Sequence, residues 1–274
     1  MKQRIISGTL CVLVLALVLC FYNTLVFEAA LSILSAIAVY EMLKANALLE
    51  HKPFLYTSVV AAAVMPYGAR FSINYIVIAI FVVAIVILTL KYHASAPFSK
   101  IAISVVATLG IGLSFSSFIL LRDKSNVAGL FYILVAFGSA WFADTGAYFT
   151  GVLFGKHKLC PNISPKKTVE GLVGGIVWNV GLLCLLAFVY TKIYASLGTE
   201  LFVNYVGICI LAVATAFAGV AGDLVASVIK RQIGIKDYGN LIPGHGGIMD
   251  RFDSILFTAP TIYFVTLFTE IISK

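Results

Sequence analysis

Residues 72–90 read SINYIVIAIFVVAIVILTL, an apolar stretch without a charged side chain. One helical crossing of a bilayer's hydrocarbon core takes about 20 apolar residues. Similar runs fill most of the chain, up to residue 21 and then at 24–43, 54–69, 72–90, 101–121, 126–149, 169–191, 201–229 and 251–272. The sequence therefore predicts an all-α, polytopic membrane protein with about nine transmembrane helices. The run at 54–69 is the shortest and is also compatible with a re-entrant segment.

The composition excludes an ordinary soluble fold. Hydrophobic residues make up 61% of the 274 positions and charged residues 11%, against about 45–50% and about 25% in globular domains. A soluble fold of this size could not bury so much apolar surface, and the loops leave no room for a separate catalytic domain. The net charge of +7 is scattered between apolar runs, so we expect no nucleic-acid partner. The five cysteines are too widely spaced for a disulfide framework or a zinc site.

The distribution of positive charge predicts the orientation in the membrane. Nine spans place the loops alternately on two faces, and lysine and arginine are enriched on the cytoplasmic face. Of the 19 lysines and arginines, 14 fall on the face that carries the N-terminus and 5 on the other. We therefore expect the N-terminal face to be cytoplasmic. The two longest loops, about 150–168 and 230–250, lie on this face, where they can form one site.

We divide the chain by its motifs into an N-terminal transmembrane scaffold, residues 1–125, and a C-terminal transmembrane catalytic region, residues 126–274, that carries both loops. The first part is poor in motifs, whereas the second holds nearly every acid expected to face the bundle interior. No repeat or flexible linker separates them, so we expect one integral membrane domain overall.

Four polar residues share one face of the predicted helix that ends near residue 231: Asp223, Ser227, Lys230 and Arg231 stand at i, i+4, i+7 and i+8. The two cations are equally compatible with a helix end from which long side chains reach water. Asp223 is harder to explain in this way. An acid in an apolar run costs roughly 2.5 kcal/mol or more, so an ion or a cationic partner is expected.

Asp250 and Asp253 stand three residues apart at the start of the last run, with Arg251 between them. This spacing predicts two carboxylates on one face of the first helical turn. Acids also favour helix N-termini because they complement the helix dipole, and this alternative accounts well for one of the two. Paired carboxylates beside basic residues are what Mg²⁺ requires to bridge a nucleotide's phosphates.

The two cytoplasmic loops carry further candidates for anion binding. The segment PGHGG at 243–247 permits close approach of backbone N–H groups to an anion, although a tight turn explains it equally. His245 has no partner at a zinc spacing, so we expect it to bond a phosphate or a base. Ser164 followed by Pro165 predicts a helix start beside Lys166 and Lys167, with free N–H groups that can bind an anion. The positive-inside rule alone also explains the two lysines.

Together these segments resemble the phosphatidate cytidylyltransferases, also called CDP-diacylglycerol synthases. The residues at 227–231, 236–237, 243–247 and 250–253 follow that family's signature without departure, and those at 144–148 and 164–171 resemble its upstream motifs. The resemblance covers about residues 140–254, whereas the earlier part is similar only in being apolar and helical. The compact length resembles the bacterial form.

The resemblance implies that CTP and phosphatidate react to give CDP-diacylglycerol and pyrophosphate in phospholipid biosynthesis, with Mg²⁺ as cofactor and K⁺ as a candidate second cation. It implies that Asp223 and Asp250 bind the metal, and it leaves Asp144 and Asp253 as catalytic residues that either ligate metal or orient cations. The residues expected to bind substrate are Ser164, Lys166, Lys167, Thr168, Ser227, Lys230, Arg231, Lys236, His245 and Arg251. We expect an integral protein of the bacterial inner membrane with its active site facing the cytoplasm. Both a monomer and a homodimer are compatible with the sequence.

Two other functions stay open at the level of sequence. Acids in or near the spans, at Glu28, Glu41, Asp144 and Asp223, are typical of an ion-coupled transporter. A transporter would place them near the bilayer midplane, whereas most of the polar residues gather at one face. A CTP-dependent lipid kinase would share the substrates but release CDP instead of pyrophosphate.

Overall fold

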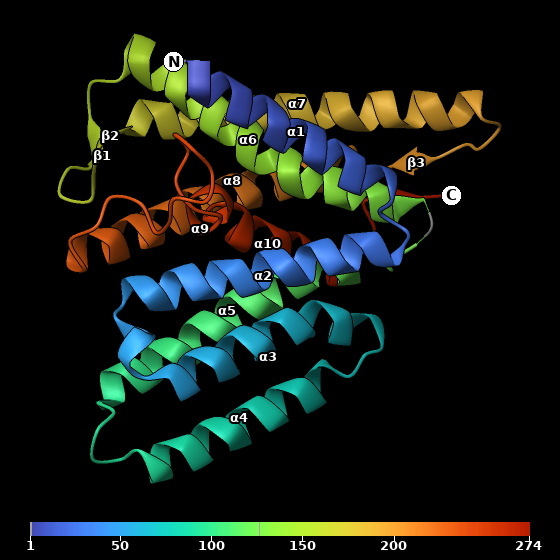
Figure 1. The fold of residues 1–274 in the computed structure, drawn as a ribbon. Helices are drawn as coiled ribbons and strands as arrows, with labels where there is room; N and C mark the ends of the chain where they lie inside the picture. The colour runs from blue at the N-terminus through green and yellow to red at the C-terminus, as the bar shows by residue number, and fades with distance from the viewer. Residues whose placement is uncertain (1, 126) are drawn as a thin grey trace. The chain divides into compact units, whose positions relative to one another are not determined.

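The computed structural model describes residues 2–125 and 127–274. The helices are α1 (Lys2–Cys20), α2 (Leu25–Ala45), α3 (Lys52–Arg70), α4 (Asn74–Lys91), α5 (Phe98–Arg122), α6 (Ala128–Phe154), α7 (Val169–Ser196), α8 (Tyr205–Gln232), α9 (Met249–Phe252) and α10 (Ile255–Phe268), with a 3-10 turn η1 (Leu48–Glu50) (Figure 1). Short strands form two antiparallel pairs, β1 (Lys158–Cys160) with β2 (Ser164–Thr168) and β3 (Phe202–Val203) with β4 (Ile272–Ser273).

The apolar runs of the sequence coincide with helices, except that the run at 251–272 is divided among the end of α9, α10 and the start of β4. The helices α2, α4, α5, α6, α7 and α8 are long and apolar enough to cross a membrane, and shorter apolar helices lie at Ile6–Cys20 and Ile255–Phe268. The prediction of an all-α polytopic membrane protein is confirmed. The exact number of nine crossings stays a prediction.

Two compact units divide the described residues. The first joins the chain up to Leu120 with Lys230–Phe252, and the second joins Leu121–Ile229 with Asp253–Lys274. Residues 230–252 thus belong to the same compact unit as the N-terminal helices. The division by motifs instead places them in the C-terminal region. The assignment of catalysis to residues 126–274 stays a prediction.

In the first unit, α2, α3 and α4 follow one another as neighbouring helices (Figure 1). The Thr24 hydroxyl caps α2 by accepting the Val26 N–H at 3.3 Å. Near the start of α2 the buried Glu28 carboxylate accepts a hydrogen bond of 2.6 Å from Arg70 at the end of α3. This ion pair gives an acid in an apolar helix the cationic partner that its burial requires. The short helix α9 packs against α2 in the same unit.

In the second unit, α6 and α7 lie side by side (Figure 1). They approach closely because α7 has glycines at the contact: a β-carbon at Gly175 would lie 2.7 Å from the Ala143 carbonyl oxygen. The buried Asn179 amide of α7 donates to the Ala212 carbonyl of α8 at 2.7 Å. On another side of α6, the Thr258 hydroxyl of α10 donates to the Ala136 carbonyl at 3.3 Å.

Two local predictions about helix starts are wrong. Ser164 does not cap a helix, because Ser164–Thr168 forms β2 and pairs with β1, so that α7 begins after Thr168. Asp250 and Asp253 do not share a first turn, because α9 ends at Phe252 and α10 begins at Ile255. At this break the Asp253 carboxylate accepts the Ser254 N–H at 2.8 Å, a local bond that competes with a continuous helix.

Candidate functional site

The second unit contains an ion pair between a loop lysine and a helix acid. Lys167 Nζ lies 2.5 Å from Asp223 Oδ2, and both side chains are partly buried. The strand β2 supplies this geometry, since alternate residues point to opposite faces: Lys166 is exposed, whereas Lys167 is half-buried. On α8 the Ser227 hydroxyl reaches Asp223 Oδ1 at 3.5 Å, a long hydrogen bond that confirms the predicted i, i+4 neighbours.

A second acid of this unit acts on the same pair. The Asp144 carboxylate of α6 is attracted by Lys167 and repelled by Asp223. Lys167 is therefore close enough to act electrostatically on Asp144 as well as on its ion-pair partner Asp223.

The start of α7 is built around the Thr168 hydroxyl, which accepts the Gly171 N–H at 3.1 Å. Glu170 lies in the first turn, where its charge complements the helix dipole. Its carboxylate also binds His157, with Oε1 2.6 Å from Nδ1. Nothing in the sequence pattern indicated this pair. A phosphate at this helix start would compete with a carboxylate already in place.

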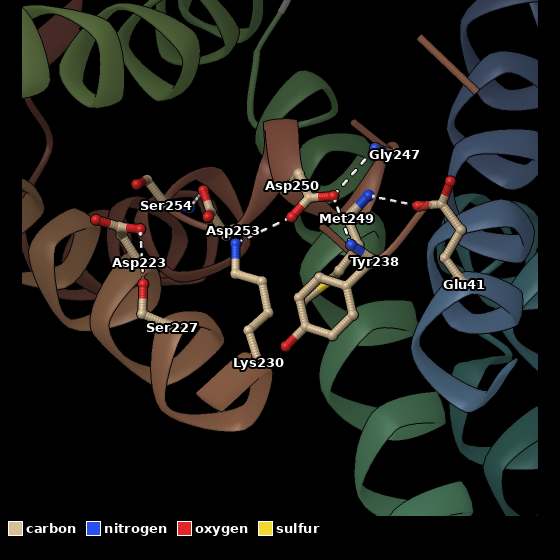
Figure 2. A network of polar contacts seen from close by, with 10 residues as sticks. All are labelled: Glu41, Asp223, Ser227, Lys230, Tyr238, Gly247, Met249, Asp250, Asp253 and Ser254. Atoms are coloured by element: carbon tan, nitrogen blue, oxygen red, sulfur yellow. Dashed lines mark hydrogen bonds and ion pairs between the residues drawn. The ribbon is translucent and has the colours of Figure 1, made fainter. Parts of the chain in front are cut away.

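Asp250 is the most completely bonded acid of the first unit (Figure 2). Its Oδ1 accepts from Lys230 at 2.9 Å, and its Oδ2 accepts from the backbone N–H groups of Tyr238 at 2.8 Å and Gly247 at 3.0 Å. The Asp250 side chain is only 2% exposed. Lys230 also lies 5.4 Å from the centre of the Tyr238 ring. The segment from Tyr238 to Gly247 therefore folds around this one carboxylate.

His245 contacts a residue that the sequence did not single out. Ser7 Oγ of α1 donates to the Pro243 carbonyl at 2.9 Å and lies 2.8 Å from His245 Nδ1. A hydroxyl has one proton, which the Pro243 carbonyl receives, so Nδ1 donates to Oγ. In the neutral ring Nε2 is then an acceptor for a donor group of a ligand.

Not all predicted binding residues have a defined partner in the part of the chain that the structure describes. The cationic residues Lys166, Arg231, Lys236 and Arg251 have exposed side chains. Ser164 is half-buried in the β1–β2 hairpin. These positions are available to a ligand without the loss of an internal ion pair.

The carboxylates fit Mg²⁺ if substrate phosphates and water supply its other ligands. Among the described residues, no group of three or more histidine, cysteine, aspartate or glutamate side chains is placed to hold a metal ion. A carboxylate has about four lone-pair positions, and the three donors on Asp250 leave one free. Mg²⁺ usually takes one or two carboxylates together with substrate phosphates and water, so a closed protein cage is not needed.

The fold and these acid–cation groups define the class: an all-α integral membrane protein with paired aspartates and lysines beside its helix ends. The model of the Cytidylyltransferase family matches residues 2–269, and the chain belongs to this family. A phosphatidate cytidylyltransferase of Bacillus subtilis (strain 168) is 36% identical over 272 residues, which cover 97% of each chain. A protein of the same name from Staphylococcus saprophyticus is 43% identical over 157 residues, 57% of this chain and 55% of that protein.

Proposed function

We propose that this chain is a membrane-bound nucleotidyltransferase that moves CMP from CTP to phosphatidate and releases CDP-diacylglycerol and pyrophosphate. The observation that carries the proposal is the family match over residues 2–269, together with 36% identity to a phosphatidate cytidylyltransferase along nearly the whole chain. The apolar helices support a lipid substrate, because its acyl chains can stay in the bilayer while the head group reacts.

The chemistry asks the protein mainly to overcome repulsion between anions. The phosphate of phosphatidate is already largely ionised near neutral pH, so a strong general base is not needed. Lys167 and Lys230, each beside an aspartate, and the exposed Arg231 and Arg251 supply positive charge for the triphosphate, the lipid phosphate and the leaving pyrophosphate. The protein would further accelerate the reaction by holding the lipid phosphate in line with the α-phosphorus of CTP.

We propose Asp223 and Asp250 as the carboxylates for Mg²⁺, with K⁺ as the second cation. The support is the oxygen chemistry of each carboxylate in its own unit and the resemblance to the family. Bound Mg²⁺ would supply charge neutralisation at the phosphates. Asp144 would add negative charge near Asp223. Asp253 would keep its hydrogen bond with the Ser254 N–H at the break between α9 and α10. Measurement of the particle mass in detergent would show whether two chains associate into a homodimer.

The direct test is to incubate the purified protein with radiolabelled CTP, phosphatidate and Mg²⁺. We expect a labelled CDP-lipid and one pyrophosphate per product. Release of CDP with a phosphorylated lipid would instead identify a lipid kinase. No lipid product under any of these conditions would contradict the proposal.

We also propose that the protein lies in a bacterial inner membrane with the loops around 150–168 and 230–250 in the cytoplasm. Asn162→Cys and Asn240→Cys place a thiol at an exposed position in each loop, and Glu200→Cys provides an exposed control between α7 and α8. On a background without the native cysteines, an impermeant maleimide should label the first two only from inside and the third only from outside. Labelling of positions 162 and 240 from opposite faces would rule out a shared side.

A further inference from the structure

Glu41 is a buried acid of α2 that contacts the glycine-rich segment of the signature. Glu41 is only 5% exposed. Its Oε2 accepts a hydrogen bond of 2.9 Å from the N–H of Met249, which is 208 positions away in the sequence (Figure 2). The Ile248 N–H also lies near this carboxylate. An acid from the motif-poor part of the chain thus accepts the backbone N–H of the residue directly before Asp250.

Two glycines of the segment lie against the same carboxylate. A β-carbon at Gly239 would lie well inside the van der Waals contact distance of Glu41 Oε1, and one at Gly247 would do the same with Oε2. Real β-carbon contacts are never this short, so any side chain at either position would displace the segment or the acid. The backbone of this segment therefore packs closely against the Glu41 carboxylate at Gly239 and at Gly247, and it is hydrogen-bonded to it at Met249.

The same segment also holds Asp250. The Gly247 N–H donates to Asp250 Oδ2, while the Met249 N–H, two residues further on, donates to Glu41 Oε2. The Tyr238 N–H, directly before Gly239, is the other backbone donor to Asp250 Oδ2. The two stretches that orient Asp250 are thus the stretches that Glu41 contacts, and a movement of one requires a movement of the other.

We propose that Glu41 is a positioning residue: it fixes residues 238–249 so that their N–H groups hold the Asp250 carboxylate in its reactive orientation. This inference rests on the proposed role of Asp250 in the cytidylyl transfer. A simpler role, in which Glu41 only satisfies buried donors for stability, predicts the same loss for any buried acid of α2. Glu28 provides that comparison, because it lies on the same helix but bonds to Arg70.

Hydrogen exchange measured by mass spectrometry in detergent tests the contact without use of activity. In Glu41→Ala we expect the peptide covering 238–250 to exchange about tenfold faster, the effect of losing a typical hydrogen bond, with α4 unchanged. Glu41→Gln keeps one acceptor and should give a smaller increase; it also serves if the alanine variant does not fold. Glu28→Gln should leave the 238–250 peptide unchanged. Equal acceleration of this peptide by Glu41→Gln and Glu28→Gln would overturn the proposal.

A double-mutant cycle then connects the contact to the reaction. Gly239→Ala should lower kcat at least tenfold because its β-carbon meets the Glu41 carboxylate. Combined with Glu41→Ala, the same change should cost little more than Glu41→Ala alone, because the obstructing group is gone. Gly110→Ala is the control, because beyond its chain neighbours and its own helix backbone no atom lies within 4 Å of the added carbon. Independent, multiplicative losses would refute the positioning role, as would faster exchange with unchanged kcat. An inactive wild-type protein would instead refute the proposed function and leave the exchange result valid.

Discussion

Asp250→Asn is expected to lower turnover by about 100-fold or more, equivalent to about 2.7 kcal/mol of transition-state stabilisation. The amide keeps the shape of the side chain but loses the charge that pairs with Lys230 and binds a hard cation. Its NH₂ group must also face either Lys230 or the N–H groups of Tyr238 and Gly247, all of which are donors. We therefore expect a stability loss as well, of about 1–3 kcal/mol.

The measurement is activity across a Mg²⁺ titration, with thermal unfolding in detergent to separate folding from catalysis. Asp123→Asn is the matched control, because Asp123 also pairs with a cation, Arg122 at 2.8 Å, but its side chain is 44% exposed. If Asp250 only complements a helix dipole, the change should cost about 0.3–1 kcal/mol of stability and leave turnover intact. Near-normal turnover with an unchanged Mg²⁺ requirement would remove Asp250 from the metal site.

Lys167→Ala is expected to lower kcat/KM by about 10–100-fold, through a higher apparent KM for a phosphate-bearing substrate and a slower turnover. The change removes a positive charge from the start of α7. It also leaves the partly buried Asp223 without the lysine that lies 2.5 Å away, so that Asp144 and Asp223 repel each other unopposed. Lys167→Arg should recover part of the loss, because the charge returns with a different shape.

Lys192→Ala is the control for a lysine at the far end of α7. Its ammonium group lies 5.5 Å from the centre of the Phe188 ring, and its side chain is exposed. Steady-state kinetics with CTP and phosphatidate varied in turn should show no change. Equal, small effects at positions 167 and 192 would mean that both lysines serve only the topology of the chain.

Helix starts show where local signals compete. Ser164 followed by Pro165 and Thr168 followed by Gly171 are both reasonable starts for one helix. The pairing of β2 with β1 decides between them, because it holds Ser164–Thr168 extended and leaves Thr168 as the cap. The pairing partner, Lys158–Cys160, has no sequence feature that distinguishes it from an ordinary loop. Likewise, the i, i+3 spacing of Asp250 and Asp253 assumed an unbroken helix, which the turn at Asp253 interrupts.

The sequence alone determined the class of fold and indicated the polar residues that we propose for the chemistry. Burial of an apolar run in a membrane depends on its length and hydrophobicity, which are local properties, and the i, i+4 contact of Asp223 with Ser227 follows from helix geometry. Only the tertiary structure decided which cation meets which acid: Lys167 with Asp223, and Lys230 with Asp250. It also placed Glu41 against Met249, 208 positions away. Electrostatic attraction and hydrogen bonding act over a few ångströms of space, and a linear sequence does not contain those distances.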